Sequence, residues 1–294
     1  MTTLAPTIPA ALTTRRPPGL FANTATLAGR EFRDALRSRW FLLYTLAFAV
    51  LGLAVSFVSA AGTGSGGLSG FGRTTAGLIN LVLLVVPLMA MTAGAGSIAS
   101  DRERGMLAYV LSQPVLRIEV LLGKYLGLAG ALLACLTLGL GLCAAILGVK
   151  GLKTSPESVL WLAGLSFLLA LSMLSVGFLI SSIARRSSAA VGTAIFVWLA
   201  LVFVSDLALM AGQMAMRMRI ETLLAWAIAN PLQVFKMWSL HAVDASLDVL
   251  GPAGLYAVEE YGRGLHAIFG AALAAWIILP LVLASLLLSR RSPL

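Results

Sequence analysis

A chain of 294 residues that is 59% hydrophobic and only 11% charged falls outside the composition of soluble domains. Its formal net charge of +9 would suit a nucleic-acid-binding protein, but no basic soluble domain is present to bind nucleic acid, so that class is excluded. The composition predicts a polytopic helical membrane protein in which the excess of basic residues reflects membrane topology.

Apolar windows of about 20 residues, the length that crosses a bilayer, occur six times in the sequence. The expected fold class is therefore an all-α polytopic membrane protein. Residues 1–26 are expected to form a disordered cytoplasmic lead, and residues 27–294 a single transmembrane domain. The expected spans cover residues 41–61, 76–98, 125–149, 159–183, 189–211 and 267–289.

Basic residues are distributed unevenly between the two sides of this arrangement. Of the 21 lysine and arginine residues, 14 fall in the terminal and inner segments and the other 7 in the outer segments. Because cytoplasmic segments carry the excess of Lys and Arg, both termini are expected in the cytoplasm.

Residues 27–40, LAGREFRDALRSRW, place Leu27, Phe32, Leu36 and Trp40 on one side of a helix and arginines on the other. This pattern predicts an interfacial elbow helix along the inner leaflet before the first span. A simple positive flank before that span is the alternative interpretation.

The second span contains Asn80 and Pro87, followed by small residues between Thr92 and Ser97. A proline within a span loosens the helix and frees a backbone carbonyl, while small residues allow close helix packing. Asn80 and Pro87 are therefore candidates for a translocation path or an outer gate.

Residues 101–124 form a charged, amphipathic insert between spans 2 and 3. Apolar positions from Met106 to Leu111 share one face of a short helix, which Pro114 ends. Two interpretations stay open: an ordinary cytoplasmic loop, or a docking element that passes force from a soluble partner into the membrane. The candidate contact residues, including a second inner loop, are Asp101, Glu103, Arg104, Gly105, Met106, Leu107, Leu111, Pro114, Arg117, Arg185 and Arg186.

Cys135 and Cys143 both fall in the third span. Eight residues on a helix separate them by about 12 Å along the axis, which is too far for a disulfide. Apolar packing is the expected role, and a soft-metal or sulfur-handling role is the alternative.

Asp206 lies toward the outer end of the fifth span. An acid within a span is a functional hypothesis by default. The alternatives are a structural ion pair with Arg217 or Arg219 and a role in the translocation path.

Residues 212–266 form the largest extramembrane segment and are expected to be short helices on the outer membrane surface. Within it, the candidate contacts for an outer partner are Arg217, Arg219, Asn230 and Pro231.

Metal-binding candidates in this outer segment are weak. Met214, Met216 and Met218 have thioethers that suit Cu(I), but alternate residues diverge on a helix. His241 and His266 are expected to be isolated, and no metal site of the chain's own is predicted.

Catalytic and nucleotide-binding motifs such as HExxH, GxSxG and the Walker sequence do not occur in the chain. No catalytic residue and no cofactor of its own are therefore expected. A polytopic chain without its own energy source is best explained as one subunit of a larger machine.

The insert resembles the conserved region of permeases of the ABC-2 type. The resemblance is carried by an acidic cluster with a glycine, a Leu-x-x-Pro step, a basic residue and a Gly-Lys pair: Asp101, Glu103, Gly105, Leu111, Pro114, Arg117, Gly123 and Lys124. Met106 departs from the threonine usual there. With the elbow helix and the six spans, the resemblance covers about residues 27–291.

This resemblance implies a homodimer in the lipid bilayer of a bacterial inner membrane, with two partner ATPases that bind ATP and Mg and dock on the insert as a coupling helix. Within the family, the chain is similar to a subgroup that supports copper-site maturation of nitrous oxide reductase together with a periplasmic partner. The similar features are the opening GREFRDALRSRWFLL, residues 185–190, Asp206 and Asn230-Pro231. The alternatives are an exporter of a lipid, glycan or drug, and a membrane scaffold that transports nothing.

Overall fold

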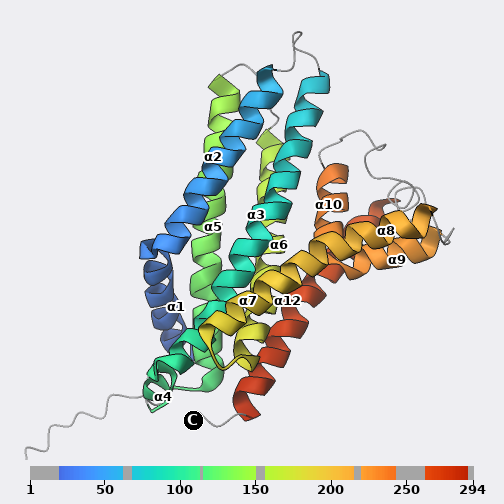
Figure 1. Cartoon of the computed structure of the whole chain (residues 1–294). Coiled ribbons are helices and arrows are strands. Elements are labelled where there is room, and N and C mark those ends of the chain that lie inside the picture. The colour runs from blue at the N-terminus through green and yellow to red at the C-terminus, as the bar shows by residue number, and fades with distance from the viewer. Residues whose placement is uncertain are drawn as a thin grey trace, which may run out of the picture.

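The structure is a computed structural model that describes residues 20–61, 68–112, 115–149, 156–214, 220–242 and 262–290. Long helices run side by side, and α8 and α9 project sideways from them (Figure 1). The elements are α1 (Leu20–Arg37), α2 (Arg39–Ala61), α3 (Leu68–Glu103), α4 (Met106–Leu111), α5 (Arg117–Val149), α6 (Pro156–Ile183), α7 (Ser187–Leu199), η1 (Ala200–Val204), α8 (Ser205–Met214), α9 (Ile220–Ala229), α10 (Pro231–Ala242), η3 (Gly262–Gly264) and α12 (Leu265–Arg290).

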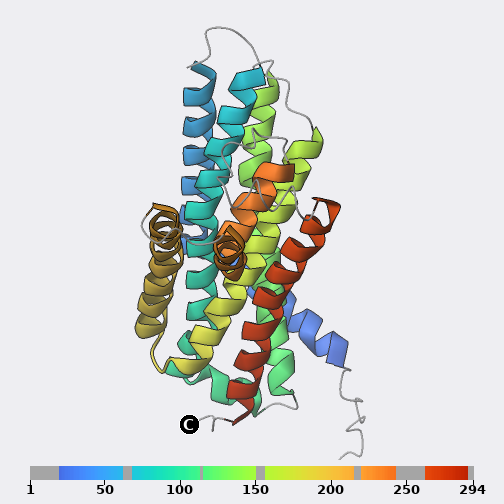
Figure 2. The same cartoon turned by 90° about the vertical axis from the view of Figure 1, so that its right-hand side faces the viewer.

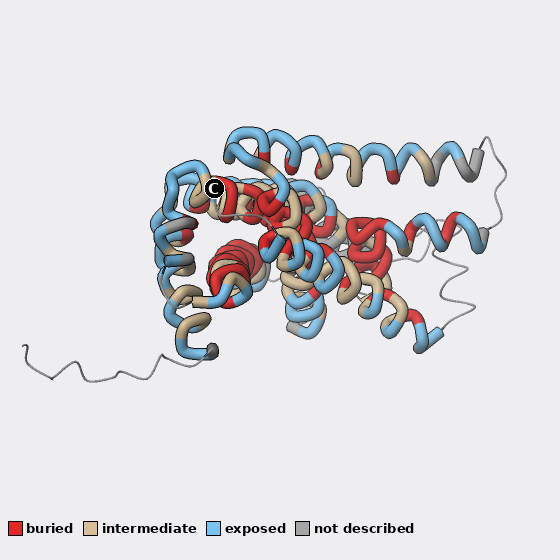
Figure 3. The backbone as a smooth tube through the Cα atoms, turned by 90° about the horizontal axis from the view of Figure 1, so that it is seen from below, coloured by how far each residue is buried: buried red, intermediate tan, exposed pale blue. Residues whose placement is uncertain are grey.

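The expected fold class is confirmed: the described residues are almost entirely helical and contain no strand. Five helices are long and apolar enough to cross a membrane, and α1 with α2, bent by 65° at their junction, makes a sixth candidate. Buried residues concentrate where the central helices meet, and the outer sides of the peripheral helices are exposed (Figure 3). The exposed residues include many large apolar side chains, among them Leu138, Leu160 and Ile278, as contact with the hydrocarbon of a bilayer requires.

The first helix, α1, differs from the expected elbow in its start and in its packing. It begins at Leu20, so residues 20–26 are helical and not part of a disordered lead, while residues 1–19 lie outside the described range. Its apolar side packs on α5, where a Cβ on Gly127 would lie 2.6 Å from the Ala28 carbonyl oxygen. The exposed side carries Arg30, Arg33 and Arg37, and Arg39 at the start of α2 is exposed as well.

The most extensive helix contact joins α3 and α6 at two glycines. A Cβ on Gly94 would lie 2.7 Å from the Leu174 carbonyl oxygen, and a Cβ on Gly177 would lie 2.5 Å from the Met91 carbonyl oxygen. One turn further along α6, the Ser181 hydroxyl accepts hydrogen bonds from the backbone of α3. The two backbones are therefore in direct contact, as small residues allow in membranes.

The fifth expected span is not a regular helix, because α7 and α8 are joined by the π-helical turn η1. A π turn disturbs the i→i−4 hydrogen-bond ladder and is common at functional sites. The side-chain amide of Asn230 donates to the Leu201 carbonyl within this turn at 2.7 Å.

The expectation that the segment after α8 rests on the membrane surface is wrong for α10. Figure 2 shows α10 within the bundle, where it contacts α3, α6 and α12. Nine of its residues are buried, among them Phe235 and Trp238. Most positions of α10 are apolar, which suits a helix that packs inside the bundle.

Candidate functional site

The short helix α4 lies at one end of the bundle, which we call the α4 end (Figure 1). Gly105 joins it to α3 with a positive φ of 70°, a conformation that glycine adopts without steric cost. The chain thus turns sharply and holds α4 against α3. The charged insert of the sequence is therefore a defined helical corner.

One side of α4 is exposed, whereas the other side is buried. Leu107 is only 3% exposed and packs into the core, whereas Met106 is 40% and Tyr109 is 66% exposed. Arg104 at the preceding turn is also exposed. Tyr109 was missing from the predicted contact residues, although its spacing of three from Met106 places both on one helix face.

The end of α3 clamps the loop between α6 and α7. The Arg102 guanidinium donates to the Ala184 carbonyl at 2.6 Å, and the Glu103 carboxylate accepts from the Ser187 backbone N–H at 3.0 Å. The positive Arg102 thus lies at the C-terminus of α6, and the negative Glu103 lies at the N-terminus of α7. Each charge has the sign that stabilises the helix dipole at that end. This clamp, Arg102 with Glu103, fixes the loop relative to α3.

The clamped loop presents two of the predicted contact residues. Arg185 and Arg186 are exposed, and the loop is tied to the last turn of α3, from which α4 continues. Together with Arg104, Met106 and Tyr109 they form what we call the docking face. Arg102 itself was not predicted, because its partners are backbone carbonyls about 80 residues away along the chain.

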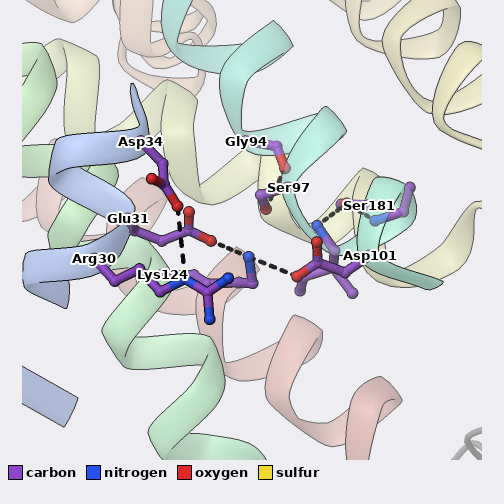
Figure 4. A network of polar contacts seen from close by, with 10 residues as sticks. Arg30, Glu31, Asp34, Gly94, Ser97, Asp101, Lys124 and Ser181 are labelled. Atoms are coloured by element: carbon purple, nitrogen blue, oxygen red, sulfur yellow. Dashed lines mark hydrogen bonds and ion pairs between the residues drawn. The ribbon is translucent and has the colours of Figure 1, made fainter. Parts of the chain in front are cut away.

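A charged node ties three helices together at the same end (Figure 4). The Lys124 ammonium of α5 pairs with Asp101 of α3 at 2.7 Å and with Glu31 of α1. The side chain of Lys124 is only 12% exposed. Asp101, predicted as a partner contact, is therefore engaged inside the chain.

Arg117 has a similar internal role. Its guanidinium donates to the Leu288 carbonyl at 2.7 Å and to the Ser289 carbonyl at 3.2 Å. These carbonyls belong to the last turn of α12, where a cation is favourable. Of the remaining predicted contacts, Pro114 and the side chain of Leu111 lie outside the described part of the structure.

A second site lies further along α3 from the α4 end, where α3, η1, α8 and α10 meet. Asn80 and Asp206, predicted separately as path candidates, line one cleft of about 150 Å³ together with Gln233 and Lys236. We call this the Asp206 cleft. Pro87 is buried in α3 and does not line the cleft.

Asp206 has an amide partner in this cleft. The Gln233 side-chain N–H donates to its carboxylate, and the predicted partners Arg217 and Arg219 lie outside the described residues. Gln233 and Lys236 were not predicted, although their spacing of three places both on one face of α10.

Asn230 and Pro231, predicted as outer contacts, begin α10 instead. Asn230 is 6% exposed, and its side-chain oxygen accepts from the Leu232 backbone N–H at 2.9 Å. Asn at the N-cap followed by Pro at the first helical position is a favoured helix start. The amide thus caps α10 and holds η1 at the same time.

The candidate metal ligands are arranged differently from the prediction. The His241 and His266 rings are not isolated, since their centroids lie 5.2 Å apart and the His266 ring also meets Trp161 and Trp238. In the part of the chain that the structure describes, no three His, Cys, Asp or Glu side chains gather as metal ligands. Met216 and Met218 fall outside that part, as does the side chain of Met214.

Both cysteines are buried in α5. Thr45 donates a hydrogen bond to the Cys135 sulfur at 3.1 Å, and the Met89 sulfur lies 3.9 Å from it. A Cβ on Gly52 would lie 2.6 Å from the Cys143 sulfur. These contacts fit the packing interpretation.

Comparison with known proteins agrees with this architecture. The model of the ABC-2 family transporter proteins matches residues 25–292. The probable ABC transporter permease protein NosY of Pseudomonas aeruginosa is 33% identical over 234 residues, which cover 75% of this chain and 82% of the relative. The protein of the same name from Stutzerimonas stutzeri is 31% identical over 274 residues, covering 90% and 97%. The chain belongs to the ABC-2 family of transporter permeases.

Proposed function

We propose that this permease works in a complex of the NosDFY type and couples a cytoplasmic ATPase to copper-site maturation of nitrous oxide reductase, by sulfur or copper handling. In this proposal two copies of the chain form a homodimer in the inner membrane, with both termini and the α4 end in the cytoplasm. A NosF-like ATPase dimer, which binds ATP and Mg, docks on the α4 ends. On the periplasmic side, a NosD-like protein binds the permease and responds to the conformational change that the ATPase drives.

The docking face is the observation that carries this proposal. Arg104, Met106 and Tyr109 are free to meet a partner, whereas Asp101, Leu107 and Arg117 are engaged inside the chain. An exposed aromatic ring with neighbouring arginines is the composition that dominates protein interfaces. The presence of two relatives named NosY supports the subgroup.

The internal contacts supply a route for movement. A displacement of α4 acts on α3 through the Gly105 turn and on α7 through the clamp of Arg102 and Glu103. The long helix α3 continues past its crossing with α6 to Asn80 at the Asp206 cleft. Rigid helices that share such contacts transmit motion as units.

The docking step is tested by changing exposed residues only. Arg104→Glu and Tyr109→Ala should each weaken binding of the ATPase about tenfold, since truncation of an interface anchor typically costs about 1–3 kcal/mol. The matched control is Arg33→Glu, an exposed arginine on α1. The measurements are co-purification of the ATPase and stimulated ATP hydrolysis in nanodiscs. Unchanged values in both docking variants contradict the proposal.

The finer role needs a separate experiment in a strain that makes nitrous oxide reductase. Deletion of this permease should leave the reductase deficient in copper-site content, measured on the purified enzyme. A complete set of copper sites in the deletion strain rejects the maturation role. An exporter of a lipid, glycan or drug or a passive scaffold would then be the remaining explanations, and the scaffold alone would keep its function with an inactive ATPase.

A further inference from the structure

The Asp206 cleft places a carboxylate and an ammonium group among apolar walls. Asp206 comes from α8 and Lys236 from α10, and the amides of Asn80 and Gln233 complete its polar lining. The other lining residues are leucines and a valine. Polar groups in a membrane protein gather in this way around water or a bound solute.

The two charges in the cleft do not pair with each other. Among the described residues, no ion pair within 4.0 Å joins Asp206 to Lys236, and the Lys236 ammonium and Asn80 amide have no hydrogen-bond partner. Gln233 occupies only one oxygen of the Asp206 carboxylate. The cleft therefore offers one anionic and one cationic contact at separate points.

The volume of the cleft limits what it accepts. At about 150 Å³ it is smaller than the roughly 300–1,000 Å³ typical of sites for drug-sized ligands. A water molecule needs roughly 10–15 Å³ by this kind of measure, so about ten non-hydrogen atoms fill the space. A glycan or a whole lipid is too large to enter.

The position of the cleft along α3 places it near a membrane boundary. Asn80 precedes Glu103, the last residue of α3, by 23 positions, which is about 35 Å along an α-helix. That length slightly exceeds the hydrocarbon thickness of about 30 Å. If the α4 end lies in the cytoplasm, which rests on the proposed function, the cleft opens at the outer boundary.

We propose that the Asp206 cleft binds a small zwitterion, whose cationic group meets Asp206 and whose anionic group meets Lys236. Two sources carry this chemistry at a membrane boundary: a free solute the size of an amino acid, and the headgroup of phosphatidylethanolamine. Asn80 and Gln233 orient the bound group through their amides. The leucine side chains account for the small size of the accepted group.

The test uses the full chain without an ATPase in nanodiscs made only of phosphatidylglycerol. The probes are tritiated L-alanine and glycerophosphoethanolamine, with N-acetyl-alanine and alanine methyl ester as analogues that each lack one charge. At least one zwitterion should bind saturably, and each singly charged analogue at least tenfold more weakly. Binding of alanine identifies a free solute, and binding of glycerophosphoethanolamine alone identifies the headgroup.

Variants assign this binding to the cleft. Asp206→Asn and Lys236→Gln should each lower zwitterion affinity on the order of tenfold, whereas Glu221→Gln, an exposed acid on α9, should not. The analogue series on the unaltered chain decides the matter if a variant fails to fold. The absence of saturable zwitterion binding, or equal binding of the singly charged analogues, overturns the proposal. Because no ATPase is present, this result is independent of the docking experiment.

Discussion

The crossing of α3 and α6 makes a sharp prediction for Gly177→Ala. The added Cβ would lie 2.5 Å from the Met91 carbonyl oxygen and 3.0 Å from the Ala95 nitrogen, and both atoms belong to the backbone of α3. Ordinary contacts begin near 3.4 Å, so the helices must separate by roughly 1 Å. Overpacking of this kind costs about 1–3 kcal/mol.

Alanine also favours helix formation by about 1 kcal/mol relative to glycine, so a matched control is needed. Gly164 lies on the same helix, and no atom of another described helix lies within 4 Å of the position that a Cβ on it would take. Gly164→Ala therefore receives the propensity gain without the clash. In an SDS titration in mixed micelles, the free energy of unfolding of Gly177→Ala should be about 1–3 kcal/mol lower than that of Gly164→Ala. Equal stability of the two variants refutes a tight backbone contact at this crossing.

Two further predictions concern polar contacts. Lys124→Met should lower the free energy of unfolding by about 2 kcal/mol, because Asp101 and Glu31 lose their shared cation. This is less than the roughly 3–5 kcal/mol that breaking a fully buried pair costs. Arg30→Met, which breaks an exposed pair, should change the free energy of unfolding by less than about 1 kcal/mol in the same SDS titration. Asn230→Ala should cost about 1–3 kcal/mol because it leaves the Leu201 carbonyl and the start of α10 without a partner, and an unchanged titration midpoint would contradict this role.

The spans and the position of the docking helix could be predicted from the sequence because each depends on local pattern. Runs of apolar residues identified the six spans, and the apolar positions from Met106 to Leu111, followed by Pro114, identified the short helix α4. The faces of α4 were harder to assign, since Leu107 and Met106 are adjacent and only the packing of α4 on α3 decides which is buried.

The remaining features depend on residues that are distant in the sequence. Gly94 and Gly177 meet across 83 positions, and Arg102 reaches carbonyls of another helix end. Such contacts follow from how the helices are arranged, which a local pattern does not specify.

The burial of α10 has the same origin. Residues 212–266 were expected to form helices at the membrane surface, but most of α10 packs in the core, and its polar residues Gln233 and Lys236 line the Asp206 cleft. A helix with polar groups directed into a cleft cannot be distinguished by composition from a helix at a surface.

The central claim is that the face of α4 bearing Tyr109 receives the ATPase. The most direct measurement replaces Tyr109 with a photoreactive phenylalanine analogue in native membranes and identifies the cross-linked partner by mass spectrometry. The control replaces Phe196, which is 72% exposed on α7. Cross-linking of the ATPase from position 109 and not from position 196 is the predicted result. The account is contradicted if the ATPase co-purifies with the permease but is not cross-linked from position 109.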